Sequence, residues 1–244
     1  MLNDLLFYIV IFTANIFQGI TGFAGTVLAM PASLFLVGYA VAKPILNVFG
    51  FLSGIYVFAG NKKHVETKVL TRILCIMGIG VICGIVIKSL VNIHARWLYI
   101  LLGIFVCAVA CYGLFGRKKE AAGISSGSRL LDGILLLTAG LVHGIFVCGG
   151  PLVITYLTKN LPDKAKFRAT ISTVWIVFNG VIMISDLVSG AFTLPVIQQL
   201  FIALPFLLGG MYAGSKLVQK MDQSFFMKLT YVLLLISGLS LLIK

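Results

Sequence analysis

The stretch Gly140-Leu-Val-His-Gly-Ile-Phe-Val-Cys-Gly-Gly-Pro151 places four glycines, a histidine and a cysteine inside a run that is apolar enough to lie in lipid. A plain membrane-spanning helix has no need of this combination. A fainter copy, Asn15-Ile-Phe-Gln-Gly-Ile-Thr-Gly-Phe-Ala-Gly25, occurs near the N-terminus. We call residues 15–25 the first glycine motif and residues 140–151 the second, and we expect the two motifs to line one site.

The overall composition is that of a protein that lives in a bilayer. Of the 244 residues, 60% are hydrophobic and 11% are charged, and the mean hydropathy is +1.09. Soluble domains carry about 25% charged residues, whereas this chain repeats apolar runs close to the length of a membrane span. The composition therefore excludes a soluble fold and predicts an all-α polytopic membrane protein.

The net charge of +12 raises the question of a nucleic-acid partner. No basic segment is interleaved with aromatic residues, and no soluble domain is present in the pattern to hold a nucleic acid. An excess of Lys and Arg in a membrane protein mostly marks its cytoplasmic loops. We therefore expect a lipid bilayer as the partner and no nucleic acid.

The hydropathy pattern divides into two halves of five helical segments each. The expected repeats cover residues 1–118 and 130–244, and the polar linker 119–129 joins them on the cytoplasmic side. The ten segments are expected at about residues 3–21, 25–41, 44–60, 69–90, 95–116, 130–147, 150–160, 167–187, 192–217 and 225–243.

The basic residues give the orientation of these segments. When the loop after residue 60 is placed in the cytoplasm, fifteen of the nineteen Lys and Arg residues fall on that side and four fall outside. This asymmetry fits the positive-inside rule and supports the segment count. Five segments per half then make the two repeats inverted relative to each other, with both termini outside a multi-pass plasma or inner membrane protein.

An internal alignment supports the duplication. With an offset of 125 residues, the first glycine motif falls on the second, Gln18 falls on His143, and Lys43 falls on Arg168. Inverted repeats are a common construction of secondary transporters, which bind their substrates at the repeat interface near the bilayer midplane.

The segment at 150–160 is too short to cross a membrane, since only about 10 apolar residues precede Lys159. We expect it to form a re-entrant hairpin with the segment before it, and we expect the same of the first two segments. Irregular backbone at that depth is tolerated where it is buried in protein or lines a cavity. The helix starts at Gly25-Thr26 and Gly150-Pro151 would then offer free N–H groups and positive helix ends to one anion.

The expected site combines these backbone groups with nearby polar side chains. The alternative for the glycines is that they only let helices pack closely. His143, an ionisable residue deep in a segment, either binds the anion, carries a proton or bonds to a neighbouring helix. The expected substrate-binding residues are Gln18, Gly19, Gly22, Gly25, Thr26, Asn47, His143, Gly144, Gly149, Gly150, Pro151, Ser172 and Thr173. Lys43 and Arg168 are expected to attract anions at the two mouths.

These residues carry a resemblance to a known family. Gln18-Gly-Ile-Thr-Gly-Phe-Ala-Gly25 with Pro31, repeated as the second glycine motif with Pro151, resembles the paired signature of the TauE/SafE family of sulfite and organosulfonate exporters. The resemblance covers essentially the whole chain. Ala24, Thr26 and Val147 stand where glycines are common in the family. The resemblance implies transport of a small sulfur-containing or carboxylate anion.

We therefore expect a secondary transporter that moves a small anion, such as sulfite or an organosulfonate, by alternating access at the glycine motifs. We expect no enzyme activity, no cofactor and no metal, because no phosphate-binding loop, acid pair or metal cluster is present. Two alternatives remain: an anion channel of the same architecture, and a membrane sulfur-transfer protein that works through Cys148. Substrate, direction, coupling ion and oligomeric state stay open, and a homo-oligomer is one of the states allowed.

Overall fold

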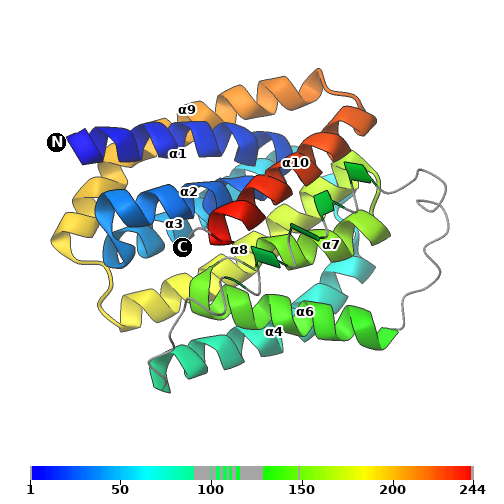
Figure 1. Cartoon of the computed structure of the whole chain (residues 1–244), viewed down its shortest axis with the longest axis horizontal. Helices are drawn as coiled ribbons and strands as arrows, with labels where there is room; N and C mark the ends of the chain where they lie inside the picture. The colour runs from blue at the N-terminus through cyan, green and yellow to red at the C-terminus, as the bar shows by residue number, and fades with distance from the viewer. Residues whose placement is uncertain are drawn as a thin grey trace. The chain divides into compact units, whose positions relative to one another are not determined.

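The computed structural model describes residues 2–90, 129–147 and 149–242, together with isolated positions between 100 and 115. The fifth expected segment, the linker and Cys148 lie wholly or largely outside the described residues. Helices make up almost all of the described part, which confirms an all-α fold (Figure 1). Their bounds are α1 Leu2–Thr21, α2 Ala24–Val37, α3 Tyr39–Asn61, η1 Lys62–His64, α4 Thr67–Leu90, α6 Arg129–Phe146, α7 Gly150–Asn160, α8 Lys164–Val188, α9 Leu194–Gln219 and α10 Gln223–Leu242.

Several helices have the length and composition of membrane spans. Five spans in the described part qualify: Leu2–Thr21, Tyr39–His64, Thr67–Ile87, Lys164–Val188 and Leu194–Gln219. By contrast, α2 has 14 residues and α7 has 11. At 1.5 Å per residue they reach roughly 21 and 16 Å, which is short of a hydrocarbon core of about 30 Å. Each of these short helices follows one of the glycine motifs.

The chain divides into two compact units that do not coincide with its sequence halves. Unit 1 comprises Met1–Glu66 and Arg168–Met221, so that it holds α1, α2, α3, nearly all of α8, and α9. Unit 2 comprises Thr67–Phe167 and Asp222–Lys244, which includes α4, α6, α7 and α10. Each unit therefore takes helices from both halves, and the expected repeat boundaries stay a prediction.

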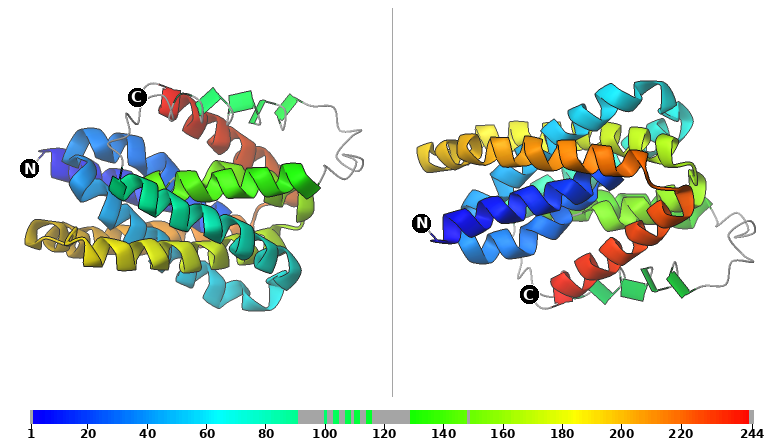
Figure 2. Two further views of the ribbon diagram at one scale, coloured as in Figure 1. Left: turned by 90° about the horizontal axis from the view of Figure 1, so that it is seen from below. Right: turned by 90° about the horizontal axis from the view of Figure 1, so that it is seen from above.

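Unit 1 is built on the pair α1 and α9, which lie side by side (Figures 1 and 2). Glycines bring the two backbones together: a Cβ added at Gly214 would lie 2.1 Å from the carbonyl oxygen of Ile16. Near the starts of the same helices, Gln199 Nε2 donates a hydrogen bond to Asp4 Oδ1 at 3.0 Å. The two helices are therefore parallel, as the expected topology requires.

Unit 2 contains an equivalent pair, α4 and α6, which also lie side by side (Figure 2). A Cβ at Gly80 would lie 2.3 Å from Leu137 O, and one at Gly140 would lie 2.2 Å from Met77 O. The pair is parallel, since Gly84 further along α4 meets Gly144 further along α6. Small residues four apart allow this close approach in membranes, so Gly80 and Gly84 pack α4 against α6.

The two glycine motifs break their helices in the same way. Gly22 follows α1 with φ 84°, and Val147 follows α6 with φ 56°. Each donates its N–H to the carbonyl four residues earlier, in Gln18 and His143 respectively, at 2.7 Å. The offset of 125 residues that aligns the motifs also aligns these two breaks. One local geometry therefore occurs in both halves of the chain.

The start of α3 differs from the expectation. We expected a helix from Pro44, but α3 begins at Tyr39 and Pro44 lies inside it. The chain turns instead at Gly38, whose φ of 77° is readily adopted by glycine. Lys43 therefore lies one turn inside α3. Arg168 also lies one turn inside its helix, because α8 begins at Lys164 rather than at the expected residue 167.

Candidate functional site

In the first glycine motif, the start of α2 is capped by side chains of α1. Gln18 Oε1 accepts the N–H of Gly25 at 2.7 Å, and Thr21 Oγ1 accepts the N–H of Ala24 at 3.2 Å. Gln18 Nε2 in turn donates to Ser53 Oγ on α3 at 2.9 Å. The Gly25 N–H, which we expected to bind an anion, is thus held by the Gln18 side chain. An anion that uses this group has to displace that side chain.

Arg168 lies next to the break between α1 and α2. Its Nη2 donates to the carbonyl oxygen of Gly19 at 2.7 Å, and only 8% of the residue is exposed. Its buried Nε has no hydrogen-bond partner, and no carboxylate of the described residues forms an ion pair with it. A buried cation without an anion is costly in a low-dielectric interior. Arg168 is therefore a ready partner for an anion.

Helices α3 and α8 run antiparallel through unit 1 along a buried polar seam. Asn47 Nδ2 donates to Asn179 O at 3.1 Å, and a Cβ added at Gly54 would lie 3.0 Å from Ser172 O. As α3 proceeds inward from Lys43, its partners on α8 move from Asp186 back toward Ser172. The seam consists of Lys43, Asn47, Gly50, Ser53 and Gly54 on α3 and of Arg168, Ser172, Asn179 and Asp186 on α8.

At the far end of this seam, Lys43 forms an ion pair with Asp186. Both residues are buried, at 4% and 3% exposed. Lys43 was expected to attract anions at a mouth, and the structure gives its charge a carboxylate partner instead. Sequence reasoning missed Asp186 because an acid near the end of a segment is ordinary. The signal was its position two turns from Asn179 on the same face of one helix.

The hydroxyl groups expected in the site serve the backbone of α8. Ser172 Oγ donates to Arg168 O at 2.7 Å, and Thr173 Oγ1 donates to Ala169 O at 2.8 Å. Thr26 on α2 lies beside the seam, since a Cβ added at Gly50 would lie 3.3 Å from Thr26 Oγ1. Of these three hydroxyls, only that of Thr26 has no backbone carbonyl as a recorded partner.

The second glycine motif lies in unit 2. His143 is buried at 2% exposed, and a Cβ added at Gly149 would lie 2.7 Å from His143 Cβ and 2.3 Å from Ala139 O. The start of α7 is therefore pressed against α6, with Pro151 in its first turn. Gly144 faces α4, where an added Cβ would lie 2.4 Å from Val81 O. The contacts of Gly144 are therefore those of a glycine that lets two helices pack closely, which was the alternative to a role in substrate binding.

The structure thus brings the expected site residues together in two groups. Unit 1 gathers Gln18, Gly19, Gly22, Gly25, Thr26, Lys43, Asn47, Arg168, Ser172 and Thr173, and unit 2 gathers His143, Gly144, Gly149, Gly150 and Pro151. Contacts within unit 1 link residues about 150 positions apart, as between Gly19 and Arg168. That the two motifs line one site stays a prediction.

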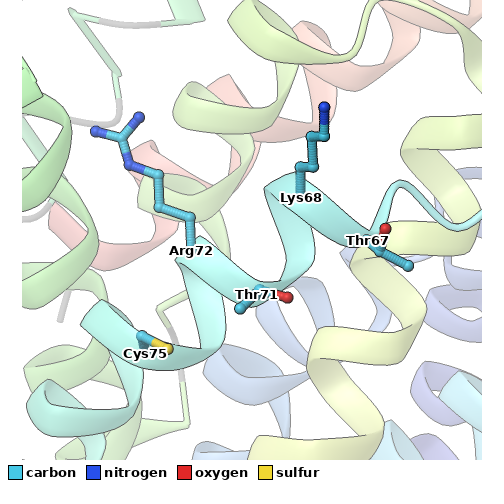
Figure 3. Close-up of a pocket in the computed structure, with 5 residues that line it drawn as sticks. All are labelled: Thr67, Lys68, Thr71, Arg72 and Cys75. Atoms are coloured by element: carbon cyan, nitrogen blue, oxygen red, sulfur yellow. The ribbon is translucent and has the colours of Figure 1, made fainter.

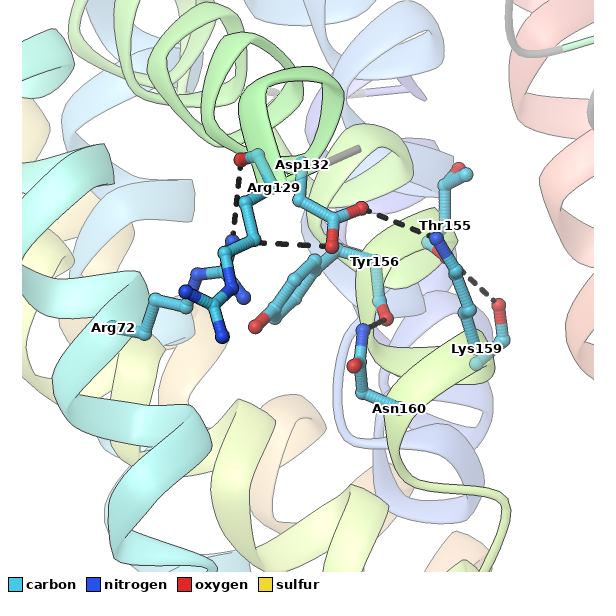
Figure 4. Close-up of polar contacts among 8 residues, drawn as sticks. Arg72, Arg129, Asp132, Thr155, Tyr156, Lys159 and Asn160 are labelled. Atoms are coloured by element: carbon cyan, nitrogen blue, oxygen red, sulfur yellow. Dashed lines mark hydrogen bonds and ion pairs between the residues drawn. The ribbon is translucent and has the colours of Figure 1, made fainter. Parts of the chain in front are cut away.

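A charged cluster joins three helices of unit 2 (Figure 4). Asp132 on α6 lies between Lys159 on α7 and Arg72 on α4, at 3.4 and 3.9 Å. Arg72 also donates to Arg129 O at 3.3 Å and stacks over the ring of Tyr156, 5.7 Å from its centroid. These contacts place the starts of α4 and α6 and the end of α7 at one level, in agreement with the expected topology.

A shallow groove of about 470 Å³ lies along the first turns of α4 (Figure 3). Thr67, Lys68, Thr71, Arg72 and Cys75 line it, and Lys68 and Arg72 extend from the same side of the helix. None of the expected site residues belongs to this groove. Within the described part of the chain, no group of three His, Cys, Asp or Glu residues is placed to hold a metal.

The fold defines the class of the protein. Long apolar helices, together with two short helices at broken glycine motifs, are those of a multi-pass helical membrane protein. The family model of the sulfite exporter TauE/SafE family matches residues 7–241, so the chain belongs to this family. This confirms the resemblance seen in the motifs, and the protein is a membrane transporter by family.

One curated relative is the probable inner membrane transporter protein TsaS of Comamonas testosteroni. It is 25% identical over 182 residues, which cover 74% of each chain. No solved structure matches the chain.

Proposed function

We propose that the protein is a secondary transporter of a small anion, with sulfite, an organosulfonate or a related carboxylate as the substrate. The observation that carries this proposal is Arg168, a buried guanidinium with an unpaired Nε beside the first glycine motif. The planar guanidinium fork binds sulfite, sulfonate and carboxylate oxygens well. An anion at this point supplies the charge that Arg168 lacks.

The surroundings of Arg168 support an exchangeable ligand rather than a fixed structural ion. The broken end of α1 exposes the Gly19 carbonyl to the guanidinium, and the Gln18 side chain holds the Gly25 N–H in the first turn of α2. Movement of one uncharged side chain therefore frees the Gly25 N–H for the same anion. Family membership and the relative's name support a transporter over an enzyme.

The proposed mechanism is alternating access. In this proposal, the first motif with Arg168 contributes substrate-binding groups in unit 1, and the second motif with His143 contributes substrate-binding groups in unit 2. The proposed orientation places the Arg72–Asp132–Lys159 cluster in the cytoplasm and both chain ends outside. No nucleotide or cofactor takes part in this proposal, and the driving force is an ion gradient or the membrane potential.

Flux through proteoliposomes tests the proposal. Purified protein should take up radiolabelled sulfite. Methanesulfonate and acetate should compete with sulfite if the site binds the anionic oxygens that all three compounds share. We expect Arg168→Gln to lower the rate about 100-fold and Arg168→Lys to lower it about 10-fold, because lysine keeps the charge and loses the fork. Lys220→Gln, an exposed cation of the same unit, is the matched control and should transport normally.

A carrier and a channel give different results in the same vesicles. A carrier loaded with unlabelled sulfite should show counterflow, a transient accumulation of label above equilibrium. Flux that never saturates and shows no counterflow contradicts the transporter. Full activity of a folded Arg168→Gln variant contradicts the assignment of Arg168.

A further inference from the structure

The Lys43–Asp186 pair at the other end of the α3–α8 seam is not used by the anion site at Arg168. The two residues lie inside candidate membrane spans, in α3 and α8. Burying a charged pair there is costly, because each ion loses its hydration before their mutual attraction is counted. Hydrophobic side chains would fill the same space at lower cost, so a purely structural role is a poor explanation.

The pair is also incompletely bonded. Lys43 Nζ contacts Asp186 Oδ1, while the buried Asp186 Oδ2 has no hydrogen-bond partner. One turn further along α3, Asn47 is fully buried and its Oδ1 also lacks a donor. Two buried acceptor oxygens without donors in one seam are uncommon, because each loses its hydrogen bonds to water on burial and gains none from the protein. A proton on Oδ2 changes that atom from an unpaired acceptor into a donor.

The charged group in contact with the Asp186 carboxylate is Lys43, because the other neighbours of Asp186 bond its backbone. From the turn between α8 and α9, Ser189 Oγ and Ala191 N bond the backbone carbonyl of Asp186, at 3.1 and 2.9 Å. The other acid near this end of unit 1, Asp4, accepts a bond from Gln199 on α9. Among the described residues, the charge that contacts the Asp186 carboxylate is therefore that of Lys43.

We propose that Asp186 is the proton-binding site that couples transport to a proton gradient, and that it does so by masking and unmasking Lys43. This inference rests on the proposed anion transport. With Asp186 ionised, the pair is neutral and Lys43 offers no net charge to an anion. When Asp186 Oδ2 takes up one proton, the carboxyl becomes neutral and the pair carries one positive charge.

The change in charge at the Lys43–Asp186 pair determines whether the proton and the anion move in the same direction or in opposite directions. Each end of the seam then carries a positive charge, that of Arg168 at one end and that of Lys43 beside Asp186 at the other. Arg168 and Asp186 are 18 residues apart on α8, which is about 27 Å along the helix axis. An anion is held more tightly when the proton is bound, and by linkage a bound anion favours the proton. The proton and the anion therefore move in the same direction, and one proton balances one monovalent anion.

Proton-coupled flux in proteoliposomes tests this inference. Radiolabelled methanesulfonate is the probe, since it keeps one negative charge over the working pH range, and a trapped pH dye reports the proton. For the wild type, we expect the half-saturating concentration to fall about 10-fold between about pH 8 and about pH 5. The Asp186→Asn variant should still show counterflow of methanesulfonate. It should lose both the accumulation of methanesulfonate driven by a pH gradient and the signal of the pH dye, and its affinity for methanesulfonate should not depend on pH.

Two further variants separate coupling from folding. Asp132→Asn, which removes an acid of the unit 2 cluster, should keep both the dye signal and the pH dependence. The double variant Lys43→Gln with Asp186→Asn removes both charges together, so it leaves no buried unpaired ion and should fold. It should bind the anion more weakly than Asp186→Asn at every pH. Wild-type proton movement in folded Asp186→Asn overturns the inference.

Infrared spectroscopy of the purified protein gives a result that does not depend on transport. Difference spectra between about pH 5 and about pH 8 should contain a carboxylic-acid C=O band that Asp186→Asn lacks. Absence of that band from the wild type, or its survival in Asp186→Asn, overturns the inference even if sulfite transport is normal. Loss of all flux in the wild type, with the band present, counts against the proposed function instead.

Discussion

Val147 is held in the left-handed backbone region at φ 56°, where a β-branched residue is rare. Its counterpart in the first glycine motif, Gly22, adopts φ 84° without that penalty. At both breaks the left-handed residue ends the helix while still donating its N–H to the carbonyl four residues earlier, as in a common helix C-cap. The second motif therefore stores backbone strain next to His143 that the first motif does not.

Replacing Val147 by glycine tests this strain. Val147→Gly loses a buried side chain worth about 1.5–3 kcal/mol but relieves about 1–2 kcal/mol of left-handed strain. Val153→Gly in α7 loses an equally buried side chain and adds a helix penalty of about 1 kcal/mol. We expect Val147→Gly to be the more stable variant by about 2 kcal/mol in thermal unfolding in detergent. Equal losses would show that Val147 is unstrained.

Single residues also mark the limit of prediction from sequence. Gln18 was expected in the site and Arg168 was expected to attract anions at a mouth, and both make buried contacts in unit 1. The partners of Gln18 were not predictable, since Ser53 lies 35 positions away. Asp186 was missed because its significance comes from Lys43, which is 143 positions distant. Chain folding, rather than local pattern, creates these pairs.

At the scale of elements, α7 was expected at 150–160 and is observed at Gly150–Asn160. The agreement has a local cause: a glycine pair and a proline fix its start, and polar residues fix its end. The start of α3 was misplaced because both Gly38 and Pro44 are helix-breaking signals. In the structure, Gly38 adopts the left-handed φ of 77° that separates α2 from α3, whereas Pro44 lies within the first two turns of α3.

The glycine contact of α4 with α6 offers a matched pair of substitutions on one helix. A Cβ at Gly140 would lie 2.2 Å from Met77 O, whereas a Cβ at Gly133 has nothing within 4 Å. We expect Gly133→Ala to raise stability by about 0.5–1 kcal/mol, since alanine favours the helix. Gly140→Ala should lower stability by about 1–3 kcal/mol, because the two backbones must separate.

Thermal unfolding of the two alanine variants in detergent gives the measurement. The difference in sign between them is the decisive result. A Gly140→Ala variant as stable as Gly133→Ala would mean that α4 and α6 do not approach as closely as the structure has them.

At the scale of the whole molecule, the charge pattern and the contacts describe the same alternation of helices. Within unit 1, the starts of α1 and α9 meet at Asp4, and the ends of α3 and α9 meet where Tyr56 and Ser215 lie 3.2 Å apart. Within unit 2, the starts of α4 and α6 meet at Arg72. Periodicity and charge were sufficient to predict these directions, while the choice of partners needed the folded structure.

The side of the membrane on which each end lies is testable by labelling. In a cysteine-free background, Lys63→Cys should react with a membrane-impermeant maleimide only from the cytoplasmic side. Ser189→Cys, in the exposed turn between α8 and α9, should react only from outside. Labelling of both variants from one side would contradict the alternation, and exchanged sides would invert the proposed orientation.

The interleaving of the halves has a consequence for synthesis. The chain passes between unit 1 and unit 2 three times, at Glu66–Thr67, Phe167–Arg168 and Met221–Asp222. Helix α1 leaves the ribosome more than 170 residues before α9, the helix that covers its glycine face. Because synthesis proceeds at about 5–20 residues per second, this face of α1 stays uncovered in the membrane for roughly 10–35 s before α9 is made. The glycine face of α4 is open for a shorter time, because its partner α6 begins at Arg129. Until their partners are made, other membrane helices can occupy these two faces.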